Sequence, residues 1–105
     1  MTSDADIRKA VEALVDRFHP ERVILFGSHA RGAADARSDV DLLVVCPIHG
    51  SRRALQVAMD RTLRGCRFAR DILVLTHEEF ERDRQIPGTI ARPAWLEGRV
   101  VYERP

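Results

Sequence analysis

Two aspartates stand at the start of one of the most apolar runs in the chain. Asp39 and Asp41 are two residues apart, and the run Leu-Leu-Val-Val at 42–45 follows them directly. Side chains two positions apart on a strand point to the same side, so the two carboxylates are expected to lie together. Burying a carboxylate costs free energy unless a partner compensates for it, so we expect a binding partner at this position.

A third carboxylate, Asp71, occurs within the next apolar run along the sequence. Three clustered carboxylates raise one another's pKa values, and divalent cations relieve that repulsion. Mg²⁺ binds carboxylate oxygens, waters and substrate phosphates, and two ions about 3.5–4 Å apart can hold the attacking and leaving oxygens of a phosphoryl transfer. Asp39, Asp41 and Asp71 are therefore predicted metal ligands and catalytic residues. For Asp71, a solvated position at a strand edge is the alternative.

Gly27 and Ser28 directly follow the apolar run 22–26 and precede a segment that could form a short helix. A glycine lets the backbone approach a ligand closely, and free N–H groups at the start of a helix suit phosphate oxygens. We therefore predict that these two residues bind the phosphates of a nucleotide, with a simple turn as the alternative. Arg31 is expected either to reach a phosphate or to form a structural ion pair. His29 is expected to be an exposed loop residue.

The elements that position these residues follow from hydrophobic spacing. Apolar residues recur at helical spacing over 7–18, after a capping box formed by Ser3 and Asp6, and Thr76 and Glu79 form a second one. Strands are predicted at 22–26, 40–46, 68–75 and 100–102, with helices at 51–64 and 76–84, one or two helical turns within 28–37 and a single turn at 93–98. This order predicts an α/β (α+β) fold with a small mixed sheet of three or four strands flanked by helices.

Composition limits the class of protein. A chain of 105 residues with 45% hydrophobic and 31% charged residues is typical of one globular domain, here predicted to span 1–105. Its net charge of +1 gives no reason to expect stable binding to nucleic acid or to a membrane. Cys46 and Cys66 lack metal or disulfide spacing, the N-terminus is polar, and no apolar run is long enough to cross a membrane. We therefore expect a cytoplasmic protein.

Two strings of residues resemble a known signature. Gly-Ser-His-Ala-Arg-Gly at 27–32 and Ser-Asp-Val-Asp-Leu-Leu-Val at 38–44 are similar to the motif of the polymerase-β-like nucleotidyltransferase superfamily. The sequence resembles in particular the minimal nucleotidyltransferases (MNT), including the antitoxin halves of HEPN/MNT toxin–antitoxin pairs. The strings LTHEEFE at 75–81 and LEGRVVYE at 96–103 also resemble that family, so the similarity covers nearly the whole chain. It implies the nucleotidyltransferase fold.

The resemblance also implies an activity and a role for each residue. Asp39 and Asp41 would bind the Mg²⁺ ion on the nucleotide side, while Asp71 would complete a second Mg²⁺ site and help to deprotonate the attacking hydroxyl. Gly27 and Ser28 would hold the β- and γ-phosphates of ATP. The implied reaction transfers a nucleoside monophosphate, expected to be AMP from ATP, to an acceptor hydroxyl, with pyrophosphate as the leaving group.

The acceptor is expected to be presented by another molecule, because only thirty residues follow position 75. The resemblance implies a HEPN-domain toxin that is modified on a tyrosine, so that the chain acts as its antitoxin in a hetero-oligomer; a homo-oligomer is also open. One alternative is an antitoxin that is catalytically weak or inactive and neutralises the toxin by binding alone. Another is an enzyme that modifies a small-molecule hydroxyl.

Overall fold

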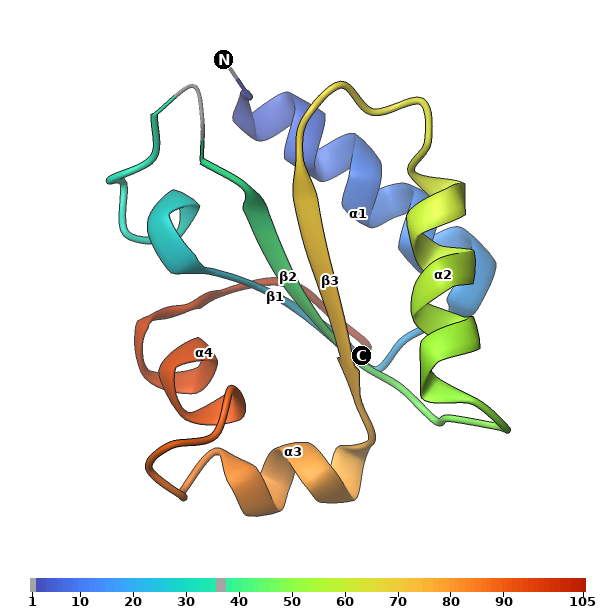
Figure 1. The fold of residues 1–105 in the computed structure, drawn as a ribbon, viewed down its shortest axis with the longest axis vertical. Helices are drawn as coiled ribbons and strands as arrows, with labels where there is room; N and C mark the ends of the chain where they lie inside the picture. Colours follow the sequence, from blue (N-terminus) through green and yellow to red (C-terminus); the bar gives the residue numbers. More distant parts are fainter. Residues whose placement is uncertain (1, 36–37) are drawn as a thin grey trace.

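A computed structural model describes residues 2–35 and 38–105 of the chain. These ranges contain four α-helices, one short 3₁₀ helix and four strands, and Figure 1 shows how they are arranged. In chain order they are α1 (Asp4–Phe18), β1 (Arg22–Phe26), η1 (Gly27–His29), β2 (Val40–Val45), α2 (Arg52–Thr62), β3 (Arg70–Leu75), α3 (His77–Asp83), α4 (Ala91–Glu97) and β4 (Arg99–Glu103).

The four strands form one mixed sheet in the order β3-β2-β1-β4. β1 is antiparallel to both β2 and β4, whereas β2 and β3 are parallel. Parallel neighbours need a crossover connection, and α2 provides it between β2 and β3. The predicted α/β (α+β) fold with a small mixed sheet and flanking helices is therefore confirmed.

Helices cover the two faces of the sheet, which is why every residue of β2 except Asp41 is apolar and buried. Alternate residues of β2, beginning with Val40 and Leu42, pack in a core cluster with α1 and α2. Leu43 and Val45 lie on the opposite face, in a second cluster with Phe80 of α3 and residues of α4. Figure 1 shows the same division, with α1 and α2 on one side of the sheet and α3 and α4 on the other. The acidic residues at the start of β2 and β3 are placed by this alternation.

Both predicted capping boxes are present. Ser3 accepts a hydrogen bond from the backbone N–H of Asp6, and Thr76 accepts one from that of Glu79. α4 begins at Ala91, two residues before the predicted start at Pro93. Pro93 is therefore in the first turn of the helix, where backbone N–H groups have no intrahelical partner, so the N–H that proline lacks is not missed.

Most other predicted segments differ from the structure by one or two residues at an end. β3 begins at Arg70 rather than at residue 68, since its register partner Val40 is the first residue of β2. Of the turns predicted within 28–37, the described part contains η1 alone, and residues 36 and 37 lie outside it.

Side chains of α2 cover the outer edge of β3. Arg52 Nη1 donates to the carbonyl oxygen of Val74 over 2.7 Å, and Gln56 Nε2 donates to that of Ile72 over 2.8 Å. These bonds occupy carbonyls of an edge strand that would otherwise be open to another chain. None of the described helices has both the length and the apolar character needed to cross a membrane.

Candidate active site

The structure brings Asp41 and Asp71 together. They are register partners in the parallel pair of β2 and β3, so their side chains are neighbours across two adjacent strands. Both lie at positions that alternate with the α1–α2 cluster, on the face that carries Leu43. Asp39 precedes β2 by one residue and is exposed, as is Asp71, whereas Asp41 is half-buried. Asp71 is therefore a third carboxylate beside Asp39 and Asp41, the two that the sequence placed together.

The electrostatics of Asp41 reflect this crowding. Burial raises the pKa of its carboxyl above the ordinary value, and the negative charges of Asp71 and Asp39 raise it further. Arg31 and the imidazole of His29 act in the opposite direction on the pKa of Asp41 and are the smaller influences. A carboxylate with a raised pKa next to two others is a site where a bound cation would be stabilised.

Gly27 lies directly against the carboxylate of Asp41. Its φ of +73° is in the left-handed region, and a Cβ at this position would fall on Asp41 Oδ2. Both features require glycine. The turn then continues into η1, where the N–H groups of Ala30 and Arg31 donate to the Gly27 carbonyl oxygen. The predicted phosphate-binding residues, Gly27 and Ser28, therefore lie beside the acidic group.

His29 is not the exposed loop residue that the sequence suggested. Its ring is half-buried, and Nε2 lies 3.3 Å from the carbonyl oxygen of Ser38. This contact links η1 to the segment that leads into Asp39, so it holds the two halves of the site together. The position of His29 between the Gly-Ser turn and the aspartate pair was the only feature of the sequence that could have indicated this role.

Arg31 forms the structural ion pair that was one of its two expected roles. Its Nη1 lies 3.8 Å from Glu97 Oε2 of α4, and both side chains are more than half exposed. A pair this exposed is weak and can be exchanged for another anion. The charge of Arg31 also acts on Asp41, so the residue lies near the acidic group. Its other expected role, contact with a phosphate, stays a prediction.

The residues present fit Mg²⁺, although the described side chains do not form a complete cage. In the described ranges, no group of three or more His, Cys, Asp or Glu is arranged so that it could hold a metal ion by itself. Mg²⁺ seldom uses such a cage and usually takes one or two carboxylates together with waters and substrate phosphates. Asp41 and Asp71 supply these carboxylates, and Gly27, one of the two predicted phosphate-binding residues, lies against the Asp41 carboxylate.

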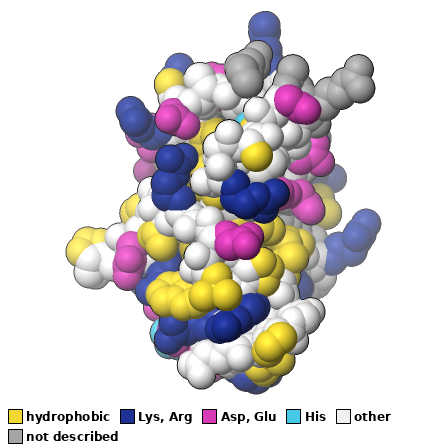
Figure 2. Space-filling view, turned by 90° about the vertical axis from the view of Figure 1, so that its left-hand side faces the viewer, with side chains coloured by type: hydrophobic (Ala, Val, Ile, Leu, Met, Phe, Trp, Pro, Cys, Tyr) yellow, Lys and Arg dark blue, Asp and Glu magenta, His cyan; other side chains and the backbone are white. Residues whose placement is uncertain are grey.

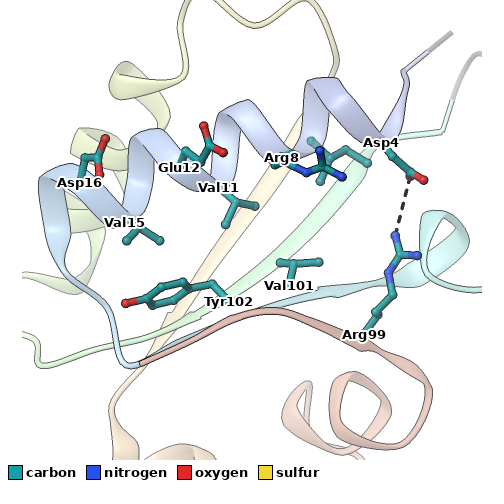
Figure 3. Close-up of a pocket in the computed structure, with 10 residues that line it drawn as sticks. Asp4, Arg8, Val11, Glu12, Val15, Asp16, Arg99, Val101 and Tyr102 are labelled. Atoms are coloured by element: carbon teal, nitrogen blue, oxygen red, sulfur yellow. Dashed lines mark ion pairs between the residues drawn. The ribbon is translucent and has the colours of Figure 1, made fainter. Parts of the chain in front are cut away.

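The largest of the described pockets lies elsewhere. Figure 3 shows a groove of about 500 Å³ between α1 and β4, with Val11, Val101 and Tyr102 at its base and an ion pair of 3.8 Å between Asp4 and Arg99 at one end. None of the three candidate aspartates and neither Gly27 nor Ser28 lines it. The groove is therefore separate from the acidic site.

Comparisons with known proteins agree with this fold. The family model described as a nucleotidyltransferase domain matches residues 7–92, and no match was found among the curated proteins. A solved structure of a Sulfolobus solfataricus protein assigned as a nucleotidyltransferase is similar with a TM-score of 0.65 and 26% identity, covering 95% of this chain and 79% of that chain.

Two further structures are toxin–antitoxin complexes, and at their low identity they support the fold alone. One, with AMP-PNP, has a TM-score of 0.65 and 14% identity and covers 92% of this chain and 73% of that chain. The other, a mutant of the MntA-HpeT pair, has a TM-score of 0.68 and 15% identity and covers 91% of this chain and 72% of that chain. Since the family model contains every residue of the acidic site and most of the sequence, this chain belongs to the nucleotidyltransferase domain family.

Proposed function

We propose that this chain is a Mg²⁺-dependent enzyme that transfers AMP from ATP to a hydroxyl group of a partner protein. The observation that carries the proposal is the placement of Asp41 beside Asp71, with Gly27 in contact with the Asp41 carboxylate. Carboxylate oxygens suit Mg²⁺, and a glycine turn at the start of a helix suits phosphate oxygens, so together they suit a metal-bound nucleotide.

In this mechanism the residues act mainly by positioning. Gly27 and Ser28 hold the β- and γ-phosphates, while Asp39, Asp41 and Asp71 hold two Mg²⁺ ions. When bound, Mg²⁺ neutralises the charge that develops on the phosphate oxygens. Asp71 accepts the proton of the acceptor hydroxyl, whose oxygen attacks the α-phosphorus in line with the departing bridging oxygen. The bond to that oxygen breaks, and pyrophosphate leaves.

The proposed acceptor is a tyrosine of a HEPN-domain toxin, so that the chain acts as an antitoxin. Two structural neighbours come from toxin–antitoxin complexes, one of them with AMP-PNP. An exposed apolar surface also favours a protein partner. Among the described residues, five of the six exposed large hydrophobic ones fall within 86–100, namely Ile86, Ile90, Trp95, Leu96 and Val100. Figure 2, which views the molecule from the side of η1 and α4, shows hydrophobic side chains gathered on the lower half of this face.

A label-transfer experiment tests the proposal. The protein is incubated with Mg²⁺, α-labelled ATP and the product of the adjacent gene, and we expect label on that partner. The variant Asp39→Asn with Asp41→Asn should lose more than about a hundredfold in rate, the size of effect seen when transition-state charge stabilisation is removed. Glu12→Gln with Asp16→Asn makes the same change in charge on α1 and should keep full activity. No transfer by the wild type, or undiminished transfer by the aspartate variant, would contradict the proposal.

A second candidate function is neutralisation of the toxin by binding alone. It is favoured by the absence, among the residues that the structure describes, of three acidic side chains arranged as a metal centre. A toxin-protection assay separates the two candidates. Full protection by the Asp39→Asn and Asp41→Asn double variant would support binding alone. Loss of protection in this variant, together with label transfer by the wild type, would support the enzyme.

A further inference from the structure

Positive charge is concentrated in one part of this nearly neutral chain. Residues 52–70 contain six arginines and one acidic residue, Asp60, whereas the net charge of the whole protein is only +1. The rest of the chain therefore has an excess of acidic residues. A local field of this kind can orient a charged partner even when the net charge of the molecule is near zero.

The structure gathers four of these arginines around one cleft. The cleft has a volume of about 370 Å³ and lies between α2 and the edge strand β3, which Figure 1 shows side by side. Its lining residues include Arg53, Arg61, Arg64 and Arg70. Arg53 and Arg61 belong to α2, Arg64 lies in the turn that follows it, and Arg70 is the first residue of β3. We call this feature the arginine cleft.

Three of the four guanidinium groups have no protein anion to bind. Arg70 lies 3.0 Å from Asp60 Oδ1 and also donates to the Asp60 carbonyl oxygen over 2.9 Å. Within the described ranges, Arg53, Arg61 and Arg64 form no ion pair, and all three are exposed. The cleft also contains Asp60, which pairs with Arg70, and Asp71, so four arginines face two carboxylates. Exposed arginines that form no ion pair are available for an anion from outside the chain.

The arginine cleft reaches the candidate active site. Asp71, the proposed proton acceptor, lines it together with its neighbours Arg70 and Ile72. The Asp71 side chain lies on the face of the sheet opposite α2, but β3 is the edge strand, so a segment in the cleft reaches it around this edge without crossing another strand. The glycine turn that would hold the nucleotide lies on the other side of Asp71, beside Asp41. Asp71 therefore has basic side chains on one side and the proposed nucleotide site on the other.

We propose that the arginine cleft binds an acidic segment of the acceptor protein next to the hydroxyl that is modified. This inference rests on the proposed function, since it assigns the acceptor side of the same site. Arg53, Arg61 and Arg64 pair with carboxylates of the segment, and the hydroxyl is thereby placed near Asp71. The three arginines are positioning and specificity-determining residues, because they do not touch the reacting atoms.

The lining of the cleft favours a protein segment over an RNA end. Single-stranded nucleic acid is usually held by aromatic side chains on which bases stack. None of the described residues that line the arginine cleft is aromatic; besides charged residues it contains Gln56, Val57 and Ile72. The amide of Gln56 already donates to the Ile72 carbonyl oxygen. Apolar contacts between arginines suit a peptide with mixed acidic and apolar side chains.

Binding of model peptides tests the inference without any chemistry. Fluorescence anisotropy compares a labelled peptide with one tyrosine flanked by glutamates, the same peptide with lysines instead, and an oligoadenylate RNA, all without ATP and Mg²⁺. We expect the glutamate peptide to bind most tightly and its affinity to fall with rising salt. Arg53→Glu with Arg61→Glu should weaken it about tenfold or more, because each exposed ion pair accounts for roughly two- to fivefold and reversal adds repulsion.

A matched control is available on α1. Lys9→Glu with Arg17→Glu has the same spacing and the same change in charge, and we expect it to bind the glutamate peptide within about twofold of the wild type. Far-UV circular dichroism verifies that both double variants are folded. Equal weakening by the two variants would overturn the proposal, since the effect would then come from net charge alone.

Other outcomes also decide the matter. Failure of the wild type to bind the glutamate peptide, or unchanged binding by the Arg53→Glu and Arg61→Glu variant, overturns the proposal. Tighter, cleft-dependent binding of oligoadenylate overturns it in favour of an RNA acceptor. If peptide binding depends on the cleft but no AMP is transferred to any partner, the arginine cleft stands and the proposed function fails. If the Arg53→Glu and Arg61→Glu variant transfers AMP as well as the wild type does, the proposed function stands and the role of the arginine cleft fails.

Discussion

Asp41 on β2 and Asp71 on β3 are direct partners in the parallel register of the sheet. This relationship joins two residues that are thirty positions apart in sequence and gives Asp41 a like-charged neighbour. The neighbour and the burial of Asp41 both raise the pKa of the Asp41 carboxyl. A protein that keeps such a pair gains nothing in stability from it, which is the physical reason to assign the pair a ligand.

Replacing Asp71 by asparagine should lower the pKa of Asp41 toward its ordinary value. Burial is the largest cause of the raised pKa and is unaffected, so the pKa should stay above the ordinary value in the variant. Carbon-detected NMR titration of the Asp41 carboxyl measures this directly. Asp60→Asn, which also removes one negative charge but is not among the charges that act on Asp41, serves as the control. An unchanged titration of Asp41 in Asp71→Asn would mean that the two carboxylates do not interact.

Replacing Asp41 by asparagine should stabilise the protein at neutral pH in the absence of Mg²⁺. The pKa of Asp41 is raised in the folded state, so the folded protein holds the proton more tightly than the unfolded chain. The free energy of unfolding of the wild type therefore falls as the pH rises from about 3.8 through the raised value. The advantage of Asp41→Asn should grow over that range and then stay constant. Urea unfolding at a series of pH values checks it, and a variant less stable than the wild type at pH 7 would contradict it.

Gly27→Ala should remove nucleotidyl transfer and destabilise the protein. The added Cβ would meet Asp41 Oδ2, and φ is +73°, so we expect a loss of about 1–3 kcal/mol in the free energy of unfolding. Gly50→Ala is the matched control, because Gly50 also has a positive φ, +84°, but nothing lies within 4 Å of its Cβ position. The control should show the smaller loss of stability and normal activity. Equal effects of the two substitutions on activity would show that backbone strain, not contact with Asp41, is responsible.

Gly98→Ala tests the packing of α4 on the sheet. Gly98 has an ordinary negative φ, yet a Cβ there would meet the Ala94 carbonyl oxygen and the Ile24 side chain of β1. Such overpacking should cost about 1–3 kcal/mol, measured by chemical denaturation. Gly65→Ala, where nothing lies within 4 Å of the Cβ position, should change stability by no more than about 0.5 kcal/mol. If both variants were as stable as the wild type, α4 would not pack as described.

The ion pair between Arg52 and Glu79 should make stability sensitive to acid. The Arg52 guanidinium, 2.7 Å from Glu79 Oε2, and the N–H of Thr76 lower the pKa of Glu79 to about 2. Because this pKa is depressed in the folded state, the stabilisation is complete above about pH 4.5 and is lost as the pH falls toward 2. Glu79→Gln should therefore be less stable than the wild type at pH 7, by about 1 kcal/mol, with the gap closing in acid.

The neighbouring residue provides the control for that measurement. Glu78 lies in the same helix, is exposed and forms no ion pair within the described part of the chain. Glu78→Gln should leave the free energy of unfolding within about 0.5 kcal/mol of the wild type at every pH. If Glu78→Gln and Glu79→Gln showed the same acid response, the loss would come from the net charge of α3 and not from Arg52.

Local patterns predicted much of the secondary structure. The two capping boxes were found because each depends on residues three positions apart, and strand 22–26 has the predicted bounds because its apolar run ends at Gly27. The start of β3 was missed because a strand begins where its partner does, and that partner is distant in sequence. The role of His29 was missed for a similar reason, since its contact with Ser38 exists only when the loop folds back.

By itself, the sequence determined the fold class, the residue types of the acidic site and the family to which the chain belongs, because hydrophobic period and motif spacing are properties of short segments. The tertiary structure alone decided that Asp71 joins Asp41 and that a Cβ at Gly27 has no space beside it. It also decided that arginines spread over residues 53–70 form one cleft. Strand register and the packing of α2 on β3 set these contacts, and both depend on residues that no local pattern connects.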